Sequence, residues 1–168
     1  VDPTAMKMLQ RLTNVDVRTI RMNDKDAISV FNSIEALKIT NPHYNEKTGA
    51  VGLPEFGTGF VRQILEMTHP QNFSGLVRVS GLSHGTDVWL NNAKNLIDEG
   101  YPFSDVIGCR DDIMVYLIHK GLPAKSAFDI MESVRKGRGL KDEWKALMAQ
   151  HAVPEWYIQS CLKIKYMF

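Results

Sequence analysis

Apolar positions recur at helical spacing along most of this chain. Between residues 58 and 66, Phe60, Val61, Ile64 and Leu65 fall on one face of a helix and polar residues fall on the other. This is the pattern of an amphipathic helix packed against a core. No stretch of any length alternates apolar and polar residues as a half-buried strand does. The pattern therefore predicts an all-α fold, an irregular multi-helix domain of about seven to nine short helices.

Prolines and glycines mark the ends of the predicted helices. Pro3 suits a first turn, where its missing N–H is not needed, and Asp2 can cap that helix. Gly100, Gly121 and Gly137 each follow a periodic segment, as a glycine that ends a helix does. Residues 163–168 contain no such closing signal, so the last helix is expected to be cut in mid-helix at the chain end. The helices are predicted from Pro3, over about residues 24–31, 58–66, 72–81, 87–99, 109–120, 123–136 and 141–150, and from Pro154 to residue 168.

The stretch from residue 39 to residue 57 is the least regular part of the chain. It contains two prolines and three glycines among polar residues, and both residue types interrupt regular structure. We expect one long irregular loop here, with at most a short strand at residues 50–53.

Composition indicates an ordinary globular chain. A length of 168 residues suggests one domain that can bury a core. No apolar run approaches the roughly 20 residues that cross a bilayer, and the first residues do not resemble a signal peptide. Cys109 and Cys161 are far apart and belong to no C-x-x-C pair, so neither a disulfide nor a zinc site is expected. We expect a cytoplasmic protein with reduced thiols and no membrane partner.

The charge is unevenly distributed. From Lys120 onward, nine Lys and Arg residues stand against five Asp and Glu, a balance of +4, which leaves eleven against fourteen, or −3, before it. Local positive potential is what phosphate binding needs. A solvated surface explains the same charges, so the imbalance alone leaves both interpretations open.

No catalytic or metal-binding residues are predicted. The acidic pairs Asp24 with Asp26 and Asp111 with Asp112 open predicted helices, where the helix dipole favours negative charge. Ser83 precedes His84 without the strand and G-x-S-x-G turn of a nucleophile elbow, and no two histidines have the i, i+4 spacing of a helical metal site. From these residues alone, the chain is interpreted as a helical binding module.

Two arginines are candidates for binding phosphate. Arg110 follows Gly108 at the predicted start of a helix, where free N–H groups and the helix dipole suit an anion. The alternative is an ion pair with Asp111, Asp112 or a neighbouring carboxylate. Arg62 lies on a polar helix face, and its alternative is an i, i+4 pair with Glu66.

Four sequence blocks resemble one family when they are read in order. They are residues 80–89 (SGLSHGTDVW), 106–117 (VIGCRDDIMVYL), 130–140 (IMESVRKGRGL) and 153–158 (VPEWYI) followed by 161–168. They are similar to the replicative DNA polymerase III alpha subunit of the PolC type, a C-family DNA polymerase. The resemblance runs from about Leu53 to the last residue, and residues 1–52 match more loosely.

This resemblance implies that the chain is the fingers region of a larger bacterial enzyme. Residues 1–52 would begin the fingers next to the palm, and residues 53–168 would form the fingers core. The whole protein would be a DNA-directed DNA polymerase, a nucleotidyltransferase of DNA replication. The fragment alone would not be catalytic and would bind no cofactor, since the catalytic aspartates and their Mg²⁺ would lie in the palm.

The implied partners are template-primer DNA, the incoming deoxynucleoside triphosphate (dNTP), the palm and remaining fingers, and a sliding clamp that binds regions outside the fragment. A free-standing helical adaptor that binds proteins through its apolar faces is the alternative. Binding of DNA that weakens steeply with salt would favour the polymerase.

The resemblance also implies roles for particular residues. Arg110 and Arg62 would bind the triphosphate. The turn near residues 80–85, whose alternative role is a capped loop between helices, would border the nucleotide base. The base pocket would contain Ser80, His84, Tyr166 and Phe168, and DNA would be bound by Arg135, Lys136, Arg138, Lys163 and Lys165.

The chain departs from the family pattern at Gly59, since the family has a basic residue within residues 56–60. One phosphate contact is therefore missing or is supplied by Arg62 or from elsewhere. Arg135, Lys136 and Arg138 also have a second possible role, because cations stabilise the C-terminus of a helix through its dipole.

Overall fold

The computed structural model describes residues 3–41 and 43–168. Over these residues the chain forms nine α-helices, short helical turns and loops, with no strand beyond one isolated bridge between Thr86 and Tyr166. The predicted all-α fold is confirmed. The predicted cap of the first helix, Asp2, lies outside the described residues. None of the helices in the described ranges is long and apolar enough to span a membrane.

The chain divides into two compact units, Val1–Leu76 and Val77–Phe168. The boundary falls within one helix, α4 (Phe73–Ser83). A single domain was expected from the length of the chain. The division at residues 52 and 53, which was inferred from the resemblance, describes similarity along the sequence and stays a prediction.

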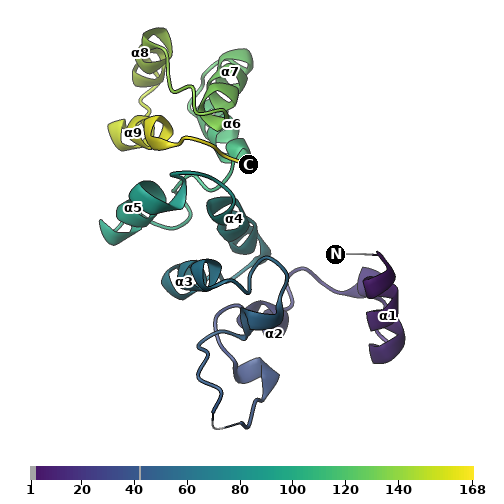
Figure 1. Ribbon diagram of the computed structural model, residues 1–168. Helices are drawn as coiled ribbons and strands as arrows, with labels where there is room; N and C mark the ends of the chain where they lie inside the picture. Colours follow the sequence, from purple (N-terminus) through teal and green to yellow (C-terminus); the bar gives the residue numbers. More distant parts are fainter. Residues whose placement is uncertain (1–2, 42) are drawn as a thin grey trace. The chain divides into compact units, whose positions relative to one another are not determined.

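The first unit contains α1 (Pro3–Thr13), α2 (Lys25–Ser29) and α3 (Gly59–Thr68) (Figure 1). Helix α3 begins where the apolar pattern predicted, because the Thr58 hydroxyl accepts a hydrogen bond from the Val61 N–H at 3.3 Å. It buries Val61, Ile64 and Leu65. Helix α1 is amphipathic in sequence, but it buries none of its residues in the described structure.

The stretch between α2 and α3 is irregular, as predicted, but the prediction of a possible short strand at residues 50–53 is wrong. A 3₁₀ turn, Gly49–Gly52, occupies this position. The Gly49 N–H donates to the Val30 carbonyl at 2.8 Å, and the Leu53 N–H donates to the Ala50 carbonyl at 2.9 Å. These bonds curl the segment back onto the end of α2 and bury Ala50 completely.

The second unit contains the end of α4 and five further helices (Figure 1). They are α5 (Lys94–Asp98), α6 (Arg110–His119), α7 (Ala124–Arg135), α8 (Asp142–Gln150) and α9 (Glu155–Lys163). Gly100, Gly121 and Gly137 have positive φ values of 95°, 90° and 67°, as predicted for glycines that end helices. The core of the unit includes Ile113 and Leu117 of α6, Ile130 and Val134 of α7, and Tyr157 of α9.

The helix predicted for residues 87–99 is interrupted. Leu90 is extended (φ −65°, ψ 140°) and Asn91 is left-handed (φ 61°), so a wide turn, Trp89–Ala93, precedes α5. A buried polar pair holds this kink, since the Ser160 hydroxyl donates to Asn92 Oδ1 at 2.8 Å and Asn92 Nδ2 donates to the Ser160 carbonyl at 3.3 Å. The hydrogen bonds of the buried Asn92 side chain stabilise this kinked conformation more than an uninterrupted helix would be stabilised.

The prediction that the last helix reaches the chain end in mid-helix is wrong. Helix α9 ends at Lys163, and Ile164 is extended. The Thr86 N–H donates to the Tyr166 carbonyl at 2.8 Å, and the Met167 N–H donates to the Arg135 carbonyl at 3.0 Å. The extended form buries Ile164 and Met167, each 1% exposed, while Tyr166 between them stays at the surface. Residues 164–168 are called the terminal segment below.

Candidate functional site

A pocket of about 450 Å³ lies within the second unit. It is built from the end of α4, the start of α6, the end of α7 and the terminal segment. A volume of this size suits a small molecule. Its lining comprises Val77, Ser80, Gly81, Cys109, Arg110, Asp111, Arg135, Tyr166 and Phe168.

Arg110 is the first residue of α6, and its side chain is 48% exposed. In the described part of the chain its ion pair is with a neighbouring carboxylate, as one form of the alternative interpretation held, but the pair is long, 4.0 Å from Nη1 to Oε1 of Glu132. The alternative pair with Asp112 does not form, because Asp112 Oδ2 is bound at 3.0 Å by Arg78 and at 2.9 Å by the Gly108 N–H. The Arg110 guanidinium therefore lines the pocket with capacity for a further anion.

Arg135 adds a second cation to the pocket. Its guanidinium binds Glu132 through two hydrogen bonds, from Nε at 2.7 Å and from Nη2 at 3.0 Å, and Lys136 Nζ lies 2.8 Å from the same carboxylate. Hydrogen bonds from Arg135 and then Lys136 lower the pKa of the Glu132 carboxyl to about 2. Because one carboxylate is shared by three cations, counting Arg110, the cluster keeps a net positive charge.

One wall of the pocket is aromatic. Tyr166 and Phe168 are 50% and 67% exposed, and the Phe168 ring lies 5.5 Å from the His84 ring, centroid to centroid. Of the residues predicted for a base pocket, Ser80, Tyr166 and Phe168 line this pocket, and His84 joins them through Phe168. Aromatic faces beside guanidinium groups can hold a flat ring that carries phosphates.

Ser83 and His84 are in contact but do not form a catalytic dyad. His84 Nδ1 lies 2.6 Å from the Ser80 carbonyl oxygen and 3.0 Å from Ser83 Oγ. A nitrogen this close to a carbonyl carries the proton, so Nδ1 donates and has no lone pair to accept the serine proton. The thiol of Cys109 is also a poor nucleophile, since burial raises its pKa.

Arg62 belongs to α3 in the first unit and is not among the residues that line this pocket. It pairs with Glu46, not with Glu66 as the alternative interpretation held, while Glu66 binds Lys47 at 2.8 Å. Its Nε is buried and has no hydrogen-bond partner among residues 3–41 and 43–168. The predicted triphosphate contact of Arg62 stays a prediction. At Gly59, nothing lies within 4 Å of the position that a Cβ would take.

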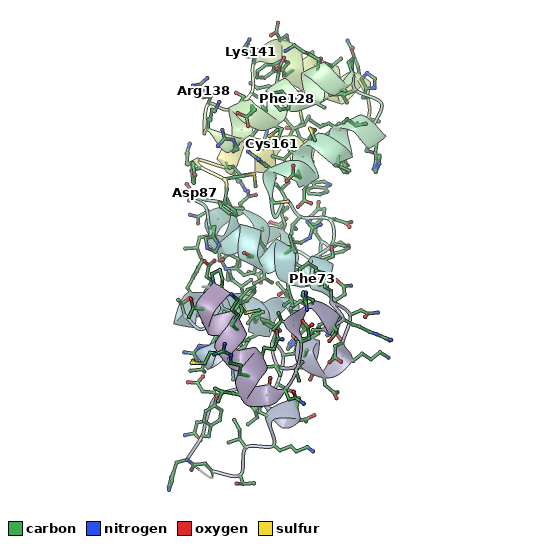
Figure 2. The ribbon with its side chains drawn as sticks, turned by 90° about the vertical axis from the view of Figure 1, so that its right-hand side faces the viewer. Phe73, Asp87, Phe128, Arg138, Lys141 and Cys161 are labelled. Carbon is green, nitrogen blue, oxygen red and sulfur yellow. The ribbon has the colours of Figure 1, made fainter. Side chains whose placement is uncertain are left out.

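The five predicted DNA-binding cations are distributed over three surfaces of the second unit. Arg135 lines the pocket described above. Lys136 and Arg138 line a second pocket, between α7 and α8, together with Lys141 and Trp144. Lys163 and Lys165 line a third pocket with Asp87 and Asn91. Figure 2 shows Arg138 and Asp87 on the same side of this unit.

Sequence reasoning missed Glu132, which binds cations of the first two pockets. The spacing of Glu132 to Arg135 and Lys136, i+3 and i+4 on a helix, was the signal that could have identified it. It also missed Val77, whose place in the pocket depends on how α4 packs. Among the described residues, no three His, Cys, Asp or Glu side chains come together to hold a metal ion.

These features define a helical module that offers guanidinium groups and aromatic rings to a ligand. The sequence of residues 2–154 matches the family model described as the bacterial DNA polymerase III alpha subunit finger domain. The chain belongs to this family.

Three relatives that match along the chain are each named DNA polymerase III PolC-type. Those of Oceanobacillus iheyensis and Clostridium perfringens are 58% identical over 168 residues, and that of Staphylococcus aureus is 57% identical over the same length. Each comparison covers 99% of this chain and 12% of the relative. The chain thus spans about an eighth of the length of these relatives.

Proposed function

We propose that this chain is the part of a replicative DNA-directed DNA polymerase that binds the incoming dNTP and helps to hold template-primer DNA. The observation that carries the proposal is the position of Arg110 in a pocket that also contains Arg135 and two exposed aromatic rings. A triphosphate is a multiply charged anion, and a guanidinium group binds phosphate oxygens through two charge-assisted hydrogen bonds. Family membership favours this function over that of a free-standing adaptor.

The pocket residues would bind different parts of the nucleotide, according to their chemistry. Arg110 and Arg135 face the phosphates, and Tyr166, Phe168 and Ser80 lie toward the base. Binding through phosphates and ring faces does not depend on base identity, and a replicative enzyme must accept all four nucleotides. Closure of such a module on the correct nucleotide would complete the reactive geometry and serve base selection.

The reaction itself would occur elsewhere in the polymerase. The Mg²⁺ ions that activate the primer hydroxyl and stabilise the leaving pyrophosphate need close carboxylates. Asp112 is bound by Arg78 and by backbone N–H groups, so the pair with Asp111 does not suit a metal ion. The palm, the remaining fingers and the clamp would act through segments outside this chain, and the enzyme would work on DNA in the cytoplasm.

The test is Arg110→Ala in the complete polymerase. Removal of a charge-assisted hydrogen bond to phosphate should raise the KM for nucleotide roughly tenfold or more, with little change in the Kd for template-primer DNA. Steady-state primer extension and a DNA-binding titration measure the two quantities.

Lys120→Ala is the matched control, since Lys120 lies at the opposite end of α6. It should leave the KM for nucleotide unchanged. An unaltered KM in Arg110→Ala would refute the assignment of this pocket to the triphosphate.

A further inference from the structure

The second pocket lies between α7 and α8, beside the backbone turn that follows α7. It measures about 440 Å³ and is lined by Lys136, Arg138, Lys141 and Trp144, with Asp129, Glu132 and Ser133. Gly137 and Gly139 have positive φ values of 67° and 72°, which turn the chain sharply after α7. The Ser133 hydroxyl donates to the Gly139 carbonyl at 2.8 Å and closes this turn. Figure 2 shows Arg138 and Lys141 near the same end of the second unit.

Two cations of the pocket, Arg138 and Lys141, have little or no charge compensation from the described residues. Its two carboxylates are already paired, Glu132 with Arg135 and Lys136, and Asp129 with Lys125 at 2.8 Å. Arg138 has no ion pair within the described ranges. Lys141 has one, a 3.5 Å contact with Glu143 in which both side chains are about two-thirds exposed, and an exposed pair of this kind contributes little. Arg138 and Lys141 can therefore bind an anion.

Trp144 indicates which kind of anion. Its indole is partly exposed, and Lys141 Nζ lies 4.7 Å from the ring centroid. A tryptophan face can stack on a nucleic acid base only where that base is unpaired, because the faces of bases within a duplex are covered by their neighbours. Cations that follow the backbone, combined with an aromatic face for the base, are typical of single-strand binding.

We propose that the pocket of Arg138, Lys141 and Trp144 binds the unpaired template strand of the DNA. This rests on the proposed function, because the template beyond the primer end is the single strand that a DNA polymerase always meets. The pocket is separate from that of Arg110, and its role is to hold the strand by its phosphates and by one stacked base. Arg138, Lys141 and Trp144 are binding residues without a part in the chemistry.

The experiment compares three DNAs on the complete polymerase, all with the same primer-template duplex. One has a blunt template end, the second has a 5′ template overhang of about ten nucleotides, and the third has a displaced non-template flap of similar length, a span within the site sizes of single-strand-binding folds. For Arg138→Ala and Trp144→Leu, the Kd should rise roughly tenfold on the overhang DNA alone. In Arg138→Ala the salt dependence of overhang binding should also weaken, because the slope falls by about 0.7 for each phosphate that the protein no longer neutralises.

Lys145→Ala is the matched control, since Lys145 belongs to α8 and lies outside the pocket, and it should not change any Kd. Equal weakening on blunt and overhang DNA, or none, would overturn the single-strand proposal, and weakening on the flap DNA alone would overturn the assignment to the template. A raised KM for nucleotide in Arg138→Ala with unchanged overhang binding would assign the pocket to the triphosphate instead. Failure of the wild-type polymerase to bind any of the three DNAs would contradict the proposed function itself.

Discussion

At the scale of single residues, Glu132 organises the positive charge of the second unit. Its carboxylate binds Arg135 and Lys136 and faces Arg110 at 4.0 Å. It therefore holds both arginines of the first pocket and one cation of the second, Lys136, and its single charge does not neutralise the three. We interpret Glu132 as a positioning residue for the proposed phosphate contacts.

The pKa of Glu132 is the first prediction at this scale. Hydrogen bonds from Arg135 and Lys136 lower it from 4.5 to about 2. Since the folded-state pKa is the lower one, the stabilisation is present above about pH 4.5 and is lost as the pH falls toward 2. A ¹³C NMR titration of the Glu132 carboxyl measures this value, and Arg135→Met with Lys136→Met should raise it.

Asp16 provides an internal control for that titration. Its pKa is also lowered to about 2, by the Arg18 side chain in the first unit, and it should not change when Arg135 and Lys136 are replaced. A Glu132 carboxyl that titrates near 4.5 in the wild-type chain would show that the cation cluster does not form.

At the scale of elements, the terminal segment supplies the aromatic wall of the first pocket. It is held on one side by Thr86 and on the other by the carbonyl of Arg135. Gly137 makes room for it, because a Cβ at this position would lie 1.9 Å from the Lys165 carbonyl oxygen. The end of α7 therefore determines where Tyr166 and Phe168 lie.

Gly137→Ala should destabilise the 168-residue chain strongly. It combines a positive φ with a backbone clash that cannot relax unless the terminal segment moves, so we expect a decrease of more than about 2 kcal/mol in the free energy of unfolding. Urea unfolding followed by circular dichroism measures the decrease.

Gly139→Ala separates the two causes. Gly139 has a similar φ of 72°, but the nearest atom to the position that a Cβ would take there is Leu162 Cδ2, at 4.0 Å. In Gly139→Ala the free energy of unfolding should therefore decrease by the backbone strain alone, about 1–2 kcal/mol. Equal destabilisation in both variants would show that the terminal segment does not pack against Gly137.

At the scale of the whole molecule, the helices differ in how deeply they are buried. Helix α1 buries none of its residues, whereas α6 buries two and α7 buries four, and α6 and α7 pack against each other. Amide hydrogen exchange in the 168-residue chain should therefore be fast in α1 and slowest in α6 and α7, because protection follows burial and local contact. Strong protection of α1 would show that its apolar face packs within this chain.

Much of the helical architecture followed from the sequence. The starts of α3 and α6, and the ends of α6 and α7 before Gly121 and Gly137, lie within a residue or two of the predicted positions. These ends depend on hydrogen bonds and φ preferences within one turn of the chain. The kink at Asn91 and the end of α9 were not predicted, because each is set by a partner far along the sequence, Ser160 in one case and Thr86 in the other.

By itself, the sequence determined the helical fold, through a periodicity that is local, and the family, through blocks of residues in a fixed order. Only the tertiary structure decided which cations share a pocket. It placed Arg110 beside Arg135, Tyr166 and Phe168, and it paired Arg62 with Glu46. The physical reason is that ion pairs and cavities depend on which distant segments pack together, and the choice among several nearby carboxylates is made by that packing and not by spacing along the chain.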